Sequence, residues 1–125
     1  MAKILLVEDD DDTRELVRLT LELDGHEVTE AASAEEGVSA ARSARPDLIL
    51  MDLSLGGKFD GLEATRRVRA SVPAQVVLLL STYDEELGMD YVADCGAAAY
   101  LSKASFGPEA LEQAWARATA RSQDR

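Results

Sequence analysis

Cysteine is almost absent from this sequence: Cys95 is the only one among 125 residues. A single thiol cannot form an internal disulfide, which fits a reducing compartment and predicts a cytoplasmic location. Long apolar runs are absent as well, because no stretch approaches the ~20 residues of a membrane-spanning helix. No signal-peptide pattern begins the chain. We therefore expect no membrane association.

Basic residues are scarce relative to acidic ones: 13 Lys and Arg stand against 24 Asp and Glu, for a net charge of -11. Such a surface repels phosphate backbones, so we expect no direct binding of nucleic acid. Repeats, low-complexity segments and internal linkers are also absent. The length and a hydrophobic fraction of 46% suit one domain with a packed core. We assign residues 1–121 to this domain and residues 122–125 to a polar C-terminal tail, with fraying expected from residue 117 onward.

Short apolar segments alternate with segments of helical spacing along almost the whole chain. Strands are predicted over 3–7, 27–31, 47–51, 75–80 and 97–101. The third and fourth are nearly continuous runs of Ile, Leu, Val and Met, as expected for strands that are covered on both faces. Five repeats of strand and helix predict a flavodoxin-like, doubly wound α/β fold, with five parallel strands in the order 2-1-3-4-5.

Local signals mark the helices between these strands. Leu16, Leu19 and Leu23 share one face of the first helix, and Gly25 is placed to end it. The sequence SAEE at 33–36 is a capping-box pattern that begins the second. Leu62, Thr65 and Val68 share a face of the third. The fourth is expected from about residue 85 to 95, ended by Gly96. The fifth is expected to begin near Pro108, with Leu111, Trp115 and Ala118 on one side.

In such a sheet, ligands bind beyond the carboxyl ends of the strands, and the residues at those ends are polar here. Strand 1 is followed by Glu8 and Asp9, strand 3 by Asp52, strand 4 by Ser81 and Thr82, and strand 5 by Lys103. Carboxylates that converge from two strands suit a hard divalent cation, for which Mg²⁺ is the common cellular choice. A cation would also offset the repulsion within the acidic run 8–12, whose later members suit the positive end of a helix.

A metal ion, the Lys103 ammonium and the Ser81 hydroxyl around Asp52 would together stabilise a transferring phosphoryl group. Asp52 is then the predicted nucleophile and forms an acyl phosphate. Serine also commonly ends strands as a turn residue. Tyr100, late in the last strand, is by itself as consistent with half-buried packing as with any other role.

The motifs LLVEDD, LILMDLSL, FDGLEATRRVR, VVLLLST and GAAAYLSKAS, in this order, resemble the receiver domain of two-component response regulators. The likeness covers about residues 3–121 and is closest to receivers of LuxR-type regulators. It implies phosphotransfer to Asp52 from a sensor histidine kinase or a phosphotransfer protein. It also implies Mg²⁺ held by Asp9, Asp52 and the backbone carbonyl of Ser54, with Glu8 acting through water.

The same resemblance implies that Ser81 and Lys103 contact the phosphoryl oxygens and that Tyr100 is an aromatic switch. On phosphorylation Ser81 is expected to move inward and Tyr100 to fill the space that it leaves. The output surface would be the face of the fourth helix, fifth strand and fifth helix, which is also a candidate homodimer interface. It would act on a downstream output domain or protein. The domain would not be an enzyme, beyond dephosphorylating itself.

Two departures from the family pattern concern the site. The loop SLGGKFDG at 54–61 lacks the usual proline and is one residue longer than the commonest form, so the conformation of residues 56–59 is open. Thr82 replaces a small residue and would narrow access to Asp52. The sequence does not decide whether the chain is a stand-alone receiver or the front of a longer regulator.

Three other functions compete with this interpretation. An aspartate-nucleophile phosphohydrolase would use DDDDT at 9–13, with Asp9 phosphorylated and Asp11 as acid-base, but helical spacing resumes already by Leu16. A flavodoxin-like FMN carrier is excluded because the five acids would repel the phosphate. A receiver-like module that signals without phosphorylation is compatible with Thr82 and the altered loop.

Overall fold

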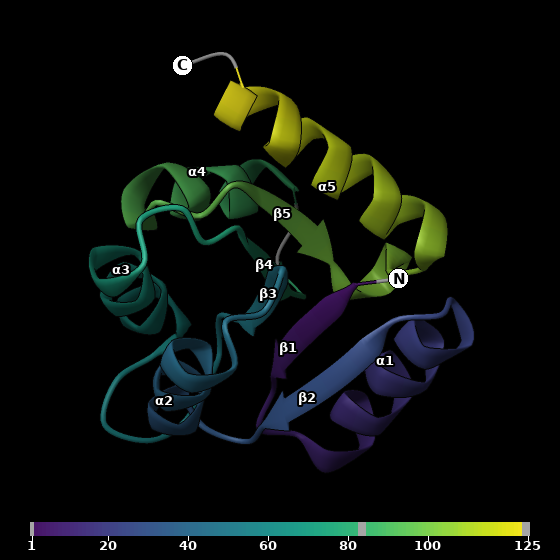
Figure 1. Ribbon diagram of the computed structural model, residues 1–125, viewed down its shortest axis with the longest axis horizontal. Helices are drawn as coiled ribbons and strands as arrows, with labels where there is room; N and C mark the ends of the chain where they lie inside the picture. The colour runs from purple at the N-terminus through teal and green to yellow at the C-terminus, as the bar shows by residue number, and fades with distance from the viewer. Residues whose placement is uncertain (1, 83–84, 124–125) are drawn as a thin grey trace.

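The computed structural model describes residues 2–82 and 85–123. In this part of the chain a five-stranded parallel sheet has the predicted order, β2-β1-β3-β4-β5 (Figure 1). Its strands are β1 (Lys3–Val7), β2 (Glu27–Ala31), β3 (Leu48–Asp52), β4 (Val77–Ser81) and β5 (Ala99–Ser102). The helices are α1 (Asp11–Leu23), α2 (Ala34–Ala44), α3 (Gly61–Ser71), α4 (Glu85–Cys95) and α5 (Pro108–Gln123), with a short 3-10 turn at Lys103–Ser105.

The sheet lies between two layers of helices (Figure 1). Helices α1 and α5 cover one face, and α2, α3 and α4 cover the other. Alternate residues of the central strands point to opposite faces, so each strand supplies both cores. One core receives Leu5, Val7, Ile49, Met51, Val77 and Leu79, and the other receives Ile4, Leu6, Leu48, Leu50, Leu78 and Leu80. This explains why β3 and β4 are continuous apolar runs.

Helix α1 has the expected ends but a different packing face. Leu16, Leu19 and Leu23 are 67%, 44% and 90% exposed, whereas Val17 and Leu21 are buried against the sheet. The apolar residues of this helix are spread around most of its circumference, so spacing alone did not single out the buried side. At the C-terminus, Gly25 has φ +87. The amides of Gly25 and His26 donate to the carbonyls of Glu22 and Leu21, which is a Schellman motif.

The other helix starts also follow their local signals. The Ser33 hydroxyl accepts from the Glu36 amide at 3.2 Å, and the Glu36 carboxylate accepts from the Ala32 amide at 3.1 Å. This is the predicted capping box with its return bond shifted by one residue. Helix α5 begins at Pro108 as predicted but continues to Gln123. Ala118 in it is buried, so residues 117–123 are helical rather than a frayed tail. Residues 124–125 of the expected tail lie outside the described residues.

Within residues 2–82 and 85–123, no helix combines the length and the apolar character that crossing a bilayer requires.

The start of α3 is pressed against the end of β3 at a glycine. A Cβ added to Gly61 would lie 2.0 Å from the Asp52 carbonyl oxygen and 3.0 Å from the Leu53 Cα. Both atoms belong to the backbone, so neither can move without shifting the strand end. Gly61 therefore lets α3 begin directly beside Asp52.

We predict that Gly61→Ala lowers the free energy of unfolding by about 2 to 3 kcal/mol, because the methyl group overpacks a backbone contact. Urea denaturation monitored by circular dichroism measures the loss. Gly107→Ala is the matched control, since a Cβ at Gly107 meets nothing within 4 Å, and it should cost less than about 1 kcal/mol. Equal losses in the two variants would contradict the role assigned to Gly61.

Candidate functional site

The strand register brings the acidic residues of β1 and β3 together. Val7 pairs with Met51 in the parallel ladder, so the next residues, Glu8 and Asp52, extend from the same edge of the sheet. Both are desolvated, with exposed fractions of 1% for Glu8 and 2% for Asp52. Two buried carboxylates side by side repel each other strongly. The prediction that these strand ends converge is confirmed.

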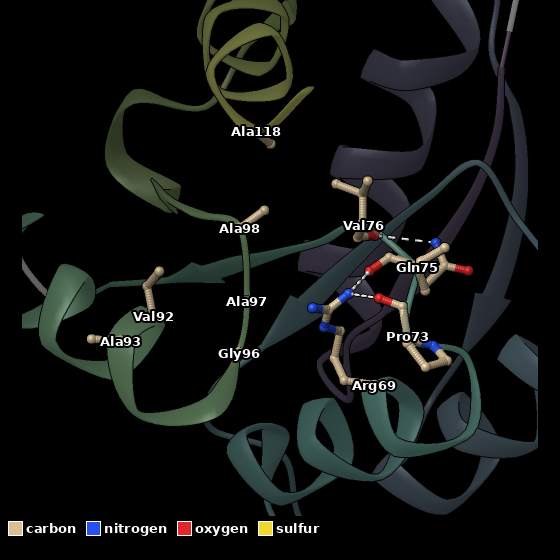
Figure 2. Close-up of a pocket in the computed structure, with 11 residues that line it drawn as sticks. Arg69, Pro73, Gln75, Val76, Val92, Ala93, Gly96, Ala97, Ala98 and Ala118 are labelled. Carbon is tan, nitrogen blue, oxygen red and sulfur yellow. Dashed lines mark hydrogen bonds between the residues drawn. The ribbon is translucent and has the colours of Figure 1, made fainter. Parts of the chain in front are cut away.

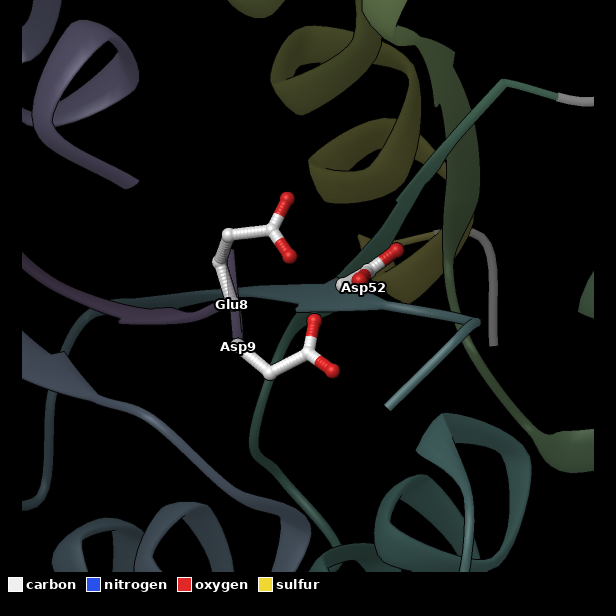
Figure 3. Close-up of side chains that lie close together, drawn as sticks. All are labelled: Glu8, Asp9 and Asp52. Atoms are coloured by element: carbon white, nitrogen blue, oxygen red, sulfur yellow. The ribbon is translucent and has the colours of Figure 1, made fainter. Parts of the chain in front are cut away.

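Asp9 completes a group of three carboxylates. Glu8, Asp9 and Asp52 each offer an oxygen, and these oxygens lie within 4.8 Å of one another. Figure 3 shows the three side chains directed toward a common space beside the ends of β1 and β3. Asp9 is exposed, so the group opens to solvent on its side. A donor set made of carboxylate oxygens, partly open to water, suits Mg²⁺.

Lys103 places a cation between the two buried carboxylates. Its Nζ lies 2.5 Å from the Glu8 Oε1 and 3.3 Å from the Asp52 Oδ1. Because it follows β5, the side chain reaches past the end of β4 to β3 and β1. Burial lowers the pKa of Lys103, but the hydrogen bond to Glu8 and the charge of Asp52 outweigh it, and the pKa is raised overall. Lys103 therefore stays charged.

Burial also raises the pKa of Glu8, and the hydrogen bond and charge of Asp52 raise it further. Lys103 acts in the opposite direction but is shared with Asp52. One ammonium thus serves two carboxylates, which leaves the ionised form of Glu8 less favourable than in water. Additional positive charge at this site would favour that form.

The acidic run 8–12 separates into three environments. Glu8 and Asp9 face the site. Asp10 is the N-cap of α1, where its Oδ2 accepts from the Thr13 amide at 2.9 Å and the Thr13 hydroxyl at 2.5 Å. These bonds lower the pKa of Asp10. Asp11 and Asp12 occupy the first turn, where negative charge complements the helix dipole. The prediction that the later acids of this run suit the start of a helix is confirmed, and Asp10 is the one that caps it.

Arg14 is a cation beside the site that sequence reasoning missed. Its Nη1 donates to the Glu8 carbonyl at 3.0 Å, and its Nη2 lies 2.7 Å from the Asp11 carboxylate. It therefore ties the first turn of α1 to the end of β1. The only signal in the sequence was a basic residue three positions after Asp11, which is common on helix surfaces.

The loop after β3 is held by its backbone amides. The Ser54 amide donates to the Asp52 Oδ1 at 3.3 Å, and the Gly56 amide donates to the Asp9 Oδ2 at 3.3 Å. Farther along, the Lys58 amide donates to the Glu35 Oε1 of α2 at 2.6 Å. This gives the longer loop a defined course. It keeps Ser54 next to Asp52, as its predicted role requires.

Ser81 ends β4 as predicted and is 1% exposed. Its backbone carbonyl accepts from the Tyr100 hydroxyl at 3.0 Å. The Tyr100 ring is 6% exposed and already buried. The expected movement of Tyr100 into space left by Ser81 would need an outward ring, which is not the position seen. Thr82 is exposed at the strand end.

A second glycine that sequence reasoning missed explains how Tyr100 is accommodated. A Cβ at Gly88 of α4 would lie 2.4 to 2.6 Å from the Cγ, Cδ1 and Cδ2 atoms of the Tyr100 ring. The ring therefore packs directly on the backbone of α4. A single glycine inside a helical pattern is a weak signal, and only the tertiary contact shows its purpose.

A cavity of about 360 Å³ lies at the opposite end of the sheet, between the C-terminal parts of α3, α4 and α5 (Figure 2). The polar groups of its wall bond to one another. Arg69 donates to the carbonyls of Pro73 and Gln75, and the side-chain amide of Gln75 donates to the Val76 carbonyl. The remaining lining is largely Ala and Val. This cavity contains none of the site residues.

Comparisons with known proteins agree on one family. A family model described as "Response regulator receiver domain" matches residues 4–116. Protein PilH of Pseudomonas aeruginosa is 38% identical over 107 residues, which cover 82% of this chain and 86% of PilH. Transcriptional regulatory protein AfsQ1 of Streptomyces coelicolor is 42% identical over 85 residues, or 68% of this chain and 37% of that protein. The chain thus matches well under half of AfsQ1.

Solved structures support the same conclusion. A two-component response regulator of the LuxR family from Aurantimonas superimposes with a TM-score of 0.82 at 32% identity, covering 96% of this chain and 86% of that chain. The chemotaxis response regulator CheY4 of Vibrio cholerae gives a TM-score of 0.81 at 32% identity, covering 94% of this chain and 98% of that chain.

We predict that Lys103→Met destabilises the fold at neutral pH by about 3 kcal/mol in the absence of divalent cations, because it leaves buried Glu8 and Asp52 without their cation. The loss should shrink as the pH falls through the raised pKa of Glu8, above its ordinary 4.5, because the carboxyl is then neutral. Urea denaturation at several pH values from 8 down to 5 tests this. The exposed Lys3→Met is the control; a pH-independent loss in Lys103→Met would contradict the charge argument.

Proposed function

Because this chain belongs to the response regulator receiver family of two-component signalling, we propose that it is a Mg²⁺-dependent phosphorylation switch whose acceptor is Asp52. The observation that carries the proposal is the cluster at the strand ends: Glu8, Asp9 and Asp52 within 4.8 Å, with Lys103 bridging two of them. It combines a metal-binding donor set, a nucleophile and a cation for phosphoryl oxygens in one place.

Each residue has a defined part in this proposal. Asp9, Asp52 and the Ser54 carbonyl would hold Mg²⁺, with Glu8 acting through water, and the ion would supply positive charge to the transferring phosphoryl group. An Asp52 carboxylate oxygen attacks phosphorus of a phosphohistidine. The N–P bond breaks, the imidazole keeps the electron pair, and an acyl phosphate forms. Lys103 and the Ser81 hydroxyl then contact its oxygens. Water reverses the modification by hydrolysis.

The phosphohydrolase alternative has less support. That reaction needs Asp11 as an acid-base next to Asp9. The Asp11 side chain is 87% exposed and paired with Arg14, outside the carboxylate cluster. The second alternative is a module that signals without phosphorylation. Such a module would be expected to lack one of the residues that phosphorylation needs, but Asp52, Lys103 and the metal-binding acids are all present. We therefore favour the phosphoacceptor role.

The partners follow from this assignment. A sensor histidine kinase or phosphotransfer protein would donate the phosphoryl group, in the cytoplasm. A downstream output domain or protein would read the face formed by α4, β5 and α5, which is also the candidate homodimer surface. Receivers are generally not enzymes, and we propose only self-dephosphorylation for this one.

Coupling between the site and this face is proposed to run through Tyr100. Its hydroxyl is bonded to the Ser81 backbone, at the site, and its ring lies on Gly88, in α4. A shift of the β4 end alters that hydrogen bond, and a shift of the ring alters the position of α4. Because the contact is closely packed, it favours two discrete arrangements over gradual deformation.

The assignment of Asp52 as the phosphoacceptor is tested with acetyl phosphate as the phosphoryl donor. Asp52→Asn should form no acid-labile adduct, because an amide is not a competent nucleophile. The Asp9→Asn protein should still be phosphorylated on Asp52. Its phosphorylation should need at least roughly tenfold more Mg²⁺, because a metal-binding carboxylate is lost. Intact-mass spectrometry and a Mg²⁺ titration measure both effects. Asp12→Asn, in the first turn of α1, is the control. An adduct on the Asp52→Asn protein would return the acceptor role to Asp9.

The coupling is tested with Gly88→Ala, which should displace the Tyr100 ring while leaving phosphorylation of Asp52 within about twofold of the parent, because the site itself is untouched. Amide and tyrosine-ring chemical shifts, with and without beryllofluoride as phosphoryl mimic, report the response of α4. We expect that response to be reduced by more than half, with Gly107→Ala as control. A full parent response in the Gly88→Ala protein would contradict the proposed route.

A further inference from the structure

A groove of about 600 Å³ is lined by residues of α2, α3 and the β3–α3 loop. These elements lie on the side of the sheet opposite α1 and α5 (Figure 1). We call it the α2–α3 groove. Val38, which is 7% exposed, and the half-buried Phe59 provide its apolar surface. It contains none of the metal-binding or phosphoacceptor residues, so it is a separate feature of the molecule.

Positive charge gathers at this groove in a protein of net charge -11. Arg42 from α2, Lys58 from the loop and Arg67 from α3 all line it. Arg42 donates to the neutral Ser71 hydroxyl at 3.0 and 3.3 Å. Among the described residues, neither Arg42 nor Lys58 forms a side-chain ion pair within 4.0 Å. Their charges therefore remain available to a ligand.

Arg67 is held in position rather than loosely solvated. Its guanidinium carbon lies 4.0 Å from the centre of the Phe59 ring, and its Nε donates to the Glu63 Oε2 at 3.0 Å. Stacking fixes the plane of the guanidinium group, which reduces the entropy lost when a carboxylate binds to it. One wall of the groove is thus a pre-ordered cation above an aromatic surface.

Glu35 is the one acid among the described residues that line the groove, and the loop donates a hydrogen bond to it. Glu35 accepts from the Lys58 amide at 2.6 Å. Gly57, with φ +108, makes this approach possible, because a Cβ there would lie 2.7 Å from the Glu35 Oε2. The rim is therefore anchored, and Lys58 is carried at a fixed place on it. Arg42 and Lys58 therefore remain without an ion-pair partner among the described residues, whereas Arg67 is already paired with Glu63 and presents the rest of its guanidinium group.

We propose that the α2–α3 groove binds an acidic peptide segment of a partner protein, with an aromatic or branched side chain placed between Val38 and Phe59. Cations from three separate elements match carboxylates spaced along an extended chain, and the apolar surface adds contact area. Nucleic acid fits less well, because three cations cannot offset the repulsion from the rest of an acidic protein. A second copy of this chain meets the same net repulsion.

The test is a titration of the ¹⁵N-labelled full chain with a short capped peptide of Glu and Asp that contains one Phe and one Leu. The matched control peptide has Gln and Asn in place of the acids. We expect the acidic peptide to shift amides of α2, residues 57–60 and α3. Binding should weaken roughly tenfold between 50 and 300 mM salt, because charge dominates. At either salt concentration, the control peptide should bind no more tightly than the acidic peptide does at 300 mM salt.

The double variant Arg42→Gln, Lys58→Gln should bind the acidic peptide roughly tenfold or more weakly than the parent, because two cations are lost. Lys3→Gln, on the exposed start of β1, is the control and should bind like the parent. Unchanged affinity in the double variant, equal binding of the neutral peptide, or shifts confined to other faces would each overturn the proposal. So would binding of a single-stranded oligonucleotide in the groove, or self-association through it in sedimentation.

Discussion

Two buried carboxylates at neighbouring strand ends, Glu8 and Asp52, impose the constraint around which the rest of the site is organised. Their repulsion is tolerable only if a cation reaches both, and Lys103 does so from beyond β5. That reach depends on the strand order, which sets β4 alone between β5 and β3. The same charge balance leaves the ionised form of Glu8 disfavoured. The site keeps an excess of negative charge even with Lys103 in place, and this excess favours the binding of a second cation.

Acidic side chains also position the loop that surrounds this site. Three backbone amides of the loop donate to three carboxylates from different elements: Ser54 to Asp52, Gly56 to Asp9, and Lys58 to Glu35. The excess of acid in this chain thus has a structural use, because these carboxylates hold the loop in place. The outer side of the loop presents Lys58 to the α2–α3 groove. A ligand in that groove would therefore contact a segment whose amides donate to Asp9 and Asp52.

Glycines mark the places where backbone meets backbone or ring at the shortest distances. Gly61 brings α3 against the Asp52 carbonyl, and Gly88 brings α4 against the Tyr100 ring. In each case a methyl group would displace a neighbouring atom, either in the backbone at Asp52 or in the Tyr100 ring beside α4. Close packing of this kind transmits displacement, because neither partner can yield without moving its element. The proposed coupling therefore depends on the absence of side chains as much as on the residues that carry chemistry.

The sequence by itself determined the alternation of strands and helices, the sheet order, the acidic start of α1, the cap at Ser33, and the residues at the strand ends. These features follow from local patterns: buried parallel strands are apolar on both faces, and helix starts need acceptors for their free amides. The tertiary structure alone decided that Leu16, Leu19 and Leu23 face outward and that Tyr100 is buried. It also decided that Gly88 packs against the Tyr100 ring and that Arg14 bonds to the Glu8 carbonyl. It also extended α5 through residues that looked like a polar tail, because Ala118 packs on the sheet. Such outcomes depend on which distant surface each side chain meets, and spacing along the chain does not encode that contact.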